Sequence, residues 1–221
     1  MTIPMSKVLG MHTLTTGYDS GFEAVELAIV NGAGDVLFDE RLKPMKKTRW
    51  SVKNQKHGVL YKHVKDCPTI AFYEKELLSI LRPAKKVVAY SGEFHALALS
   101  NSGFTYLEEK KHVIDVMDLH ARNYLERTED DIYWYDEFGD RHRRKYVRAP
   151  QAVTMSEAVM DFPNVLEGIG YGDAGDAVWA AAASVFMYLE MCKREDRGAA
   201  RSIDIVDRPY AINYAHMHRL D

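Results

Sequence analysis

Three short apolar stretches near the start of the chain have the pattern of β-strands. The first covers residues 7–14, the second is Ala24–Asn31, and the third covers residues 36–42. An Asn-Gly-Ala-Gly turn joins the second stretch to the third, and its residues tolerate a positive φ. The pattern therefore predicts a β-hairpin over residues 24–42, with one further strand before it.

Helical and strand patterns alternate further along the chain. Apolar positions at helical spacing predict helices over residues 69–81 and 93–100, and apolar runs predict strands over residues 85–90 and 113–117. Strands that alternate with helices are typical of parallel pairing through helical crossovers. The remaining predicted elements are a short helix over 155–161, a long Ala-rich helix over 173–193 and a strand over 203–206.

Residues 131–148 interrupt this alternation. Aromatic and charged residues flank an Asp-Glu-Phe-Gly-Asp stretch, which predicts an inserted hairpin with a basic second arm. Nothing else divides the chain, so we expect a single domain over residues 1–221. Its parts are a core over about 7–193, the hairpin over about 131–148 and a C-terminal extension over about 198–221.

Composition and charge exclude several classes of protein. The chain has 221 residues, a hydrophobic content of 47% and a net charge of −3, which is typical of an ordinary globular protein. Its two cysteines, Cys67 and Cys192, do not form a zinc or redox motif. No secretion signal or membrane-spanning run is present. We therefore expect a cytoplasmic protein without a membrane partner.

The strongest local charge imbalance lies in the segment of residues 41–65, which we call the basic segment. It contains nine lysines and arginines and no acidic residue, with Trp50 and Tyr61 between the cations. Cations that neutralise phosphates and aromatic rings that stack on bases are the parts of a single-strand binding surface. An alternative interpretation is that lysines and arginines flank any loop, and that the aromatic rings in residues 131–148 pack the inserted hairpin onto the core. The predicted nucleic-acid-binding residues are Lys46, Lys47, Arg49, Trp50, Lys53, Lys56 and His57, with Arg143 and Arg144 in the hairpin.

Several motifs occur in an order that resembles one known family. They are Thr15-Thr16-Gly17 after the first predicted strand, Glu26 to Val30 in the second, Val36 to Pro44 in the third, the Val87 to His95 stretch, and Gly175 to Ala177. This order resembles the DEDDh family of 3'-to-5' exonucleases, which includes ribonuclease T and polymerase proofreading subunits. The resemblance implies an α/β fold with a ribonuclease-H-like five-stranded mixed sheet. Three antiparallel strands would be followed by parallel strands, with helices on both sides.

The resemblance also implies where catalytic residues should lie. The family cleaves phosphodiester bonds with two divalent ions, and its carboxylates hold them because magnesium prefers oxygen ligands. The five matching positions here carry His12, Leu14, His95, Tyr171 and Asp176. Only Asp176 keeps the family's residue, and a leucine cannot bind a metal. We therefore expect an exonuclease fold without nuclease activity and without a cofactor, which acts by binding nucleic acid or a protein.

Alternatives remain open at this stage. An active Mg- or Mn-dependent exonuclease would need substitute ligands, for which Asp19, Glu93 and Asp173 are candidates. His12, His95 and Asp176 could also form a site for iron, zinc or manganese. A third alternative is an inhibitor or scaffold that binds a protein partner through residues 131–148. A homodimer is a further option, since the ribonuclease T branch forms dimers.

Overall fold

The computed structural model describes residues 3–51, 57–110, 112–124, 129–135, 141–147, 153–170, 172, 175–194, 203–204 and 210–212. Strands 129–135, 141–147 and 203–204 are described by their backbone. No helix in these ranges is long and apolar enough to cross a membrane.

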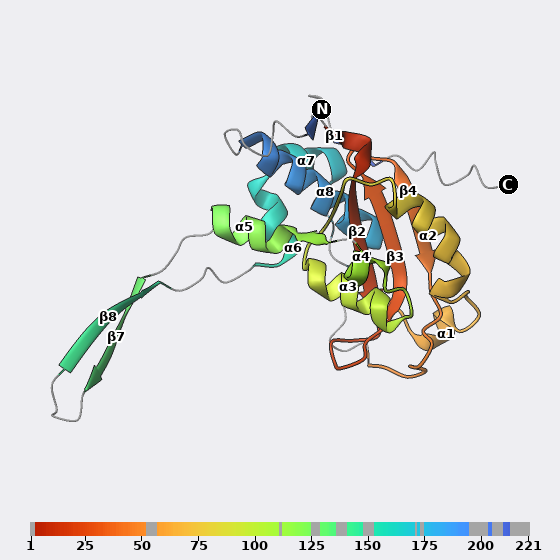
Figure 1. Ribbon diagram of the computed structural model, residues 1–221, viewed down its shortest axis with the longest axis horizontal. Coiled ribbons are helices and arrows are strands. Elements are labelled where there is room, and N and C mark those ends of the chain that lie inside the picture. The colour runs from red at the N-terminus through yellow and green to blue at the C-terminus, as the bar shows by residue number, and fades with distance from the viewer. Residues whose placement is uncertain are drawn as a thin grey trace.

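A five-stranded mixed sheet forms the centre of the protein (Figure 1), and its strands are in the order β4-β3-β2-β5-β6. They are β2 (Val8–Thr15), β3 (Ala24–Asn31), β4 (Val36–Arg41), β5 (Lys86–Ala89) and β6 (Val113–Asp115). β3 is antiparallel to both β2 and β4, whereas β5 is parallel to β2 and β6 is parallel to β5. The predicted α/β class and this mixture of strand directions are therefore confirmed.

Helices occupy the connections after β4. The four helices that the sequence predicted are present with different ends, and four further described helices were not predicted. The predicted helix over 69–81 starts as a 3-10 turn and becomes α-helical at Glu74. The long helix begins at Ala177, and residues 173 and 174 lie outside the described residues. The described helices are α1 (Tyr61–Val64), α2 (Glu74–Leu81), α3 (Gly92–Asn101), α4 (Tyr106–Lys110), α5 (Val116–Tyr124), α6 (Met155–Ala158), α7 (Pro163–Ile169) and α8 (Ala177–Arg194), with 3-10 turns at Met5–Lys7, Ile70–Tyr73 and Val159–Asp161.

The prediction of a strand over residues 113–117 was wrong at its end. The strand stops at Asp115, whose carboxylate accepts hydrogen bonds from the backbone N–H groups of Met117 and Asp118. This is the bonding of a helix N-cap, so the chain turns into α5 at Val116.

The two faces of the sheet are covered by different helices. β2 is buried over its whole length, as expected for a central strand with both faces covered. Its even-numbered residues Val8 and Leu14 belong to the apolar cluster around α8, α7 and α6. Its odd-numbered residues Leu9 and Met11 belong to a second cluster with residues of α2, α3 and α4. The sheet is therefore the middle layer of three.

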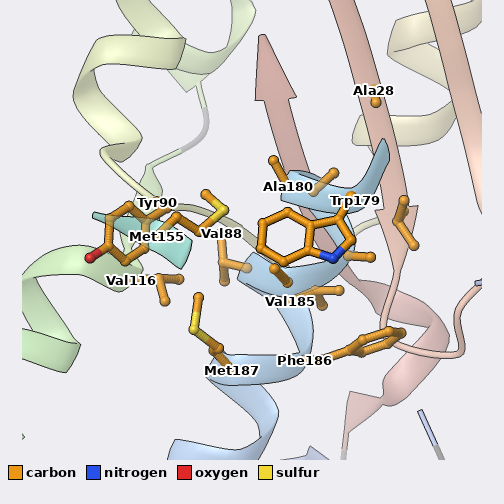
Figure 2. Packing of buried hydrophobic residues seen from close by; sticks show 14 of the residues in the cluster. Ala28, Val88, Tyr90, Val116, Met155, Trp179, Ala180, Val185, Phe186 and Met187 are labelled. Carbon is orange, nitrogen blue, oxygen red and sulfur yellow. The ribbon is translucent and has the colours of Figure 1, made fainter. Parts of the chain in front are cut away.

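Helix α8 lies very close to the sheet. A Cβ atom placed on Gly10 of β2 would lie 2.1 Å from the backbone oxygen of Ala181, so only a glycine fits there. The small side chains of the alanines in α8 let the helix approach β2 closely. Trp179 and Phe186 of the same helix fill the apolar cluster around these alanines (Figure 2). Tyr90 packs with Val116 and Met155 in the same cluster (Figure 2). The Ala-rich sequence of α8 is therefore a consequence of its contact with the sheet.

The predicted inserted hairpin is confirmed. β7 (Glu129–Tyr135) and β8 (Arg141–Val147) pair antiparallel and form a two-stranded sheet of their own. The hairpin extends away from the sheet and its helices (Figure 1).

A strand near the start of the chain and a strand from residues 203–204 form a small parallel sheet. β1 (Ile3–Pro4) pairs with β9 (Ile203–Asp204), which confirms the first half of the strand predicted over residues 203–206. Residues 205–206 lie outside the described residues.

Candidate functional site

One edge of β2 becomes accessible where β5 ends, and His95 of α3 occupies this place. β5 pairs with β2 at Val8 to Gly10, so the later residues of β2 extend past it. The backbone N–H of Thr13 donates to Nδ1 of His95 at 3.2 Å, and the Thr13 hydroxyl lies 2.8 Å from the same nitrogen. Nε2 of His95 donates to the carbonyl of Tyr90 at 2.9 Å. The imidazole therefore continues the hydrogen bonding of the sheet.

This environment keeps His95 neutral. Burial lowers the pKa of His95 to about 4, although the hydrogen bond to the Tyr90 carbonyl partly opposes this effect. The side chain is buried, and both ring nitrogens are used within the protein. A histidine binds a metal through the lone pair of a ring nitrogen. In this arrangement that lone pair accepts the Thr13 N–H, so a metal would have to displace the bond.

His12 and Leu14 lie in β2, and His12 contacts His95 of α3. The His12 and His95 ring centroids are 4.4 Å apart, and both side chains are buried. Leu14 belongs to the apolar cluster under α8. The structure thus places two of the five predicted positions in contact and a third in the same strand as one of them, and it fills them with two imidazole rings and a hydrocarbon side chain.

Asp176 lies at the start of α8 and caps it. Its Oδ1 accepts a hydrogen bond from the backbone N–H of Trp179 at 2.9 Å. Its charge also acts on two carboxyl groups of β3 and β4. Burial, together with the charges of Glu26 and Asp176, raises the pKa of Asp39 to about 6. For Glu26, burial raises the pKa, nearby Arg41 lowers it, and Asp176 adds to the increase.

Glu26 was not among the candidate residues predicted from the sequence. It lies opposite Leu14 in the register of β2 and β3, and its carboxylate is 3.2 Å from Arg41. A single glutamate within the otherwise apolar strand Ala24–Asn31 was the signal that could have identified it. This ion pair places one further carboxylate beside the position of Leu14.

The other possible substitute ligands do not join this group. Asp19 forms an ion pair with Lys47 at 2.6 Å, and Glu93 lines a different cavity next to β6. Tyr171 and Asp173 lie outside the described residues. Within the part of the chain that the structure describes, no group of three or more His, Cys, Asp or Glu side chains is arranged to hold a metal ion.

The basic segment is held against the sheet by the buried carboxylate of Glu23. Its two oxygens accept hydrogen bonds from the backbone N–H groups of Met45, Lys46 and Lys47, at 2.8 to 3.2 Å. The backbone of Glu23 in turn bonds to Thr16. One buried charge therefore fixes the first half of the basic segment next to the Thr-Thr-Gly turn.

A cleft of about 440 Å³ lies between this turn and the basic segment. Asp19 lines the cleft and neutralises Lys47, while Arg49 also lines it and is exposed to solvent. Lys46 is exposed in the same segment. The residues that line the cleft are Thr16, Gly17, Tyr18, Asp19, Lys47, Arg49, Trp50 and Ser51.

Two of the predicted binding residues mainly support the segment itself. The indole N–H of Trp50 donates to the carbonyl of Val59 at 2.8 Å, and its ring packs edge-on against Tyr61. Nε2 of His57 donates to the carbonyl of Thr15 at 3.0 Å. The indole of Trp50 therefore holds the basic segment together through Val59 and Tyr61.

Four predicted residues have no described side chain. Lys53 and Lys56 lie outside the described residues, and Arg143 and Arg144 belong to a strand described by its backbone. Their predicted contact with nucleic acid stays a prediction.

Tyr18 is an exposed aromatic residue at the cleft. It was not predicted from the sequence as a binding residue. Its side chain is 72% exposed, and its ring centroid lies 5.6 Å from that of Phe94. Phe94 stacks on Phe22 at 4.5 Å, so Tyr18 rests on a supported pair of rings. An aromatic residue immediately after the Thr-Thr-Gly turn was the available signal.

No protein-family model matches the sequence, and a search of curated proteins finds no match.

Proposed function

We propose that this chain is a ribonuclease-H-like protein of the DEDDh exonuclease type that binds single-stranded nucleic acid without cleaving it. The observation that carries the binding proposal is the cleft between the Thr-Thr-Gly turn and the basic segment. It combines exposed Arg49 with an exposed, supported aromatic ring, Tyr18. Cations along the backbone path and rings that stack on bases are sufficient for single-strand binding without sequence preference.

The strand arrangement supports the proposed family. Three antiparallel strands, β4, β3 and β2, are followed by the parallel strands β5 and β6. Two of the positions that match the family's catalytic residues also meet, because His12 and His95 are in ring contact, and Leu14 lies two residues from His12 in β2. This convergence is what the resemblance requires of the fold.

The chemistry of those positions supports binding without cleavage. A two-metal mechanism needs anionic oxygens that bridge the ions, and Leu14 has none. His95 is neutral and bonded on both nitrogens, as described above. Glu26 is engaged with Arg41, and Asp176 caps α8. Two of the carboxylates in this region are therefore occupied, Glu26 with ion pairing and Asp176 with helix capping.

A combined binding and cleavage assay tests the proposal. Labelled single-stranded DNA and RNA are incubated with the full chain and Mg or Mn. We expect binding, measured by fluorescence anisotropy, that weakens as salt is added, and intact strands on a denaturing gel. Absence of binding would overturn the proposal. Degradation that stops with a chelator and with Asp176→Ala would show an active exonuclease instead.

Matched variants locate the binding surface. Lys46→Glu with Arg49→Glu should weaken binding strongly, whereas Lys75→Glu with Arg82→Glu, the same charge change at exposed positions near α2, should not. Tyr18→Ala should weaken binding roughly fivefold or more, since stacking contributes about 1–3 kcal/mol per base. Phe72→Ala is its control, because Phe72 is equally exposed at 72% but lies outside the cleft.

A further inference from the structure

An ion pair lies in the cleft between the Thr-Thr-Gly turn and the basic segment. The ammonium group of Lys47 donates to Oδ1 of Asp19 at 2.6 Å, and both residues line the cleft. This hydrogen bond lowers the pKa of the Asp19 carboxyl, so the group is ionised at neutral pH. Arg49 is the other cation of the lining. In the free protein, a carboxylate therefore occupies the place where a phosphate would meet Lys47.

The two partners of this ion pair are held differently. The backbone N–H of Lys47 donates to the buried carboxylate of Glu23 at 2.8 Å, and the Lys47 side chain is only 21% exposed. Asp19 lies in the exposed turn of residues 18–21, and its side chain is 70% exposed. Gly21 ends this turn with a φ of 77°, and a Cβ atom there would meet nothing within 4 Å. The cation is therefore anchored through its backbone, whereas the carboxylate can rotate away into solvent.

A phosphate can replace the carboxylate without loss of bonding for Lys47. Both groups are oxygen anions that accept a hydrogen bond from an ammonium group, and an exposed ion pair contributes little to stability, so the exchange costs little. Asp19 also follows Tyr18 directly in the chain, and Tyr18 is the exposed ring on which a base would stack. The phosphates of a nucleotide stacked there pass close to the ion pair.

We propose that Asp19 is a built-in competitor of the nucleic-acid backbone: a phosphate of the bound strand displaces its carboxylate and takes its place on Lys47, with Arg49 in the same cleft. This inference rests on the proposed function and deepens it, because it identifies one phosphate site and the residue that restricts access to it. Such a competitor lowers the affinity for every strand, and it disfavours ligands that offer no phosphate at this place.

The affinity of the full chain for labelled oligo(dT), measured by fluorescence anisotropy, tests the proposal. Asp19→Asn removes the competitor, and we expect it to tighten binding roughly two- to fivefold. The control is Asp66→Asn, which removes the same charge from an exposed aspartate that pairs with Lys65 next to the basic segment. It should change the affinity by less than about 1.5-fold, because an exposed charge away from the cleft is screened by salt.

The salt dependence of binding separates displacement from simple repulsion. Each phosphate that is neutralised on a single strand adds about 0.7 to the slope of log affinity against log salt. If Lys47 binds a phosphate in the wild type, Lys47→Met should lower this slope by about 0.7, and Asp19→Asn should leave it unchanged. If Asp19 stays on Lys47 and only repels the strand, Lys47→Met leaves the slope unchanged and Asp19→Asn raises it.

Two results would overturn this inference alone. One is an Asp19→Asn variant that binds no more tightly than the wild type, and the other is the pattern of slopes expected for simple repulsion. Absence of binding by both the wild type and Asp19→Asn would instead overturn the proposed function, and this inference with it.

Discussion

At the scale of single residues, His95 has a structural role, because hydrogen bonds hold both nitrogens of its ring. Its ring bonds to Thr13 on one side and to the Tyr90 carbonyl on the other. Such bonding requires the neutral imidazole, because a protonated Nδ1 could not accept the Thr13 N–H. Protonation therefore breaks a hydrogen bond and places a charge in the core.

The stability of the protein should depend on pH through this residue. The pKa of His95 is lowered to about 4 in the folded state, below the ordinary value of 6.5. The unfolded chain therefore binds the proton first as the pH falls. The stabilisation is fully present above about pH 6.5 and is lost as the pH falls through the folded pKa.

We expect His95→Gln to flatten this dependence. A glutamine can accept from Thr13 and donate to Tyr90, but it does not titrate. Between about pH 6.5 and 4, the free energy of unfolding of the wild type should fall more steeply than that of the variant, by on the order of 1 kcal/mol per pH unit. Urea unfolding at several pH values measures both slopes.

Asp39 also titrates in this pH range, but it does not affect the difference in stability between the wild type and His95→Gln. Its pKa is raised to about 6 from 3.8, so its contribution has the opposite sign and is lost as the pH rises through that range. Both chains keep Asp39, and its effect cancels in the difference between them. Equal slopes for wild type and variant would contradict the assignment of a buried neutral imidazole.

Some residues of the candidate site were predictable from the sequence, and others were not. His12, Leu14 and His95 were identified by their order relative to the motifs, and two of them proved to be in ring contact. Tyr18 and Glu26 were missed because nothing in their local sequence shows what they face. Tyr18 gains its role from Phe94, which is distant in sequence, and Glu26 from Arg41 on the next strand.

At the scale of elements, the position of the basic segment depends on a single carboxylate. Glu23 is fully buried and binds three successive backbone N–H groups. Hydrogen bonds to an ionised group are stronger than neutral ones, and a buried donor without a partner is costly. The segment should therefore lose its place against the sheet when this charge is removed.

Glu23→Gln tests this dependence. The amide keeps the shape of the side chain but turns one acceptor into a donor that faces other donors, so we expect a loss of about 2–4 kcal/mol in the free energy of unfolding. Glu74→Gln at an exposed position should change it by less than about 0.5 kcal/mol. Urea denaturation measures both, and similar values for the two variants would show that Glu23 does not hold the segment.

Elements were predictable to the extent that their apolar pattern was regular. The strands of the sheet and the long helix follow from apolar runs and helical spacing. Helix α5 was missed because its sequence alternates polar and apolar residues without a clear start. The bonds of the Asp115 carboxylate to Met117 and Asp118 mark that start, and an aspartate is recognised as a cap only once its strand is known to end there.

At the scale of the whole molecule, Tyr210 joins residues near the end of the chain to helix α8 in the core. Its hydroxyl donates to the buried Glu190 of α8 at 2.8 Å, and its ring lies 4.6 Å from that of Phe186. Lys193 also pairs with Glu190 at 2.8 Å. Gly168 lies so close to Tyr210 that a Cβ atom there would be 2.0 Å from its backbone oxygen. Tyr210 is therefore a packed part of the fold.

We expect Tyr210→Phe to destabilise the protein by about 1–2 kcal/mol, because the buried carboxylate loses one of its hydrogen bonds while the ring packing remains. Tyr18→Phe removes the same group from a side chain that is 72% exposed, and it should have almost no effect. Thermal unfolding compares the two variants. A loss of equal size in both would contradict the role of the Tyr210 hydroxyl.

The sequence by itself determined the class of the fold and the order of its elements, because the periods of apolar residues are local properties of the chain. It also showed that a leucine and two histidines stand where the resemblance expects carboxylates. Only the tertiary structure decided that His95 is neutral, that Glu23 anchors the basic segment, and that Tyr18 stands exposed at a cleft. These three features depend on burial and on contacts with residues distant in sequence. Burial and such contacts arise only when the chain packs.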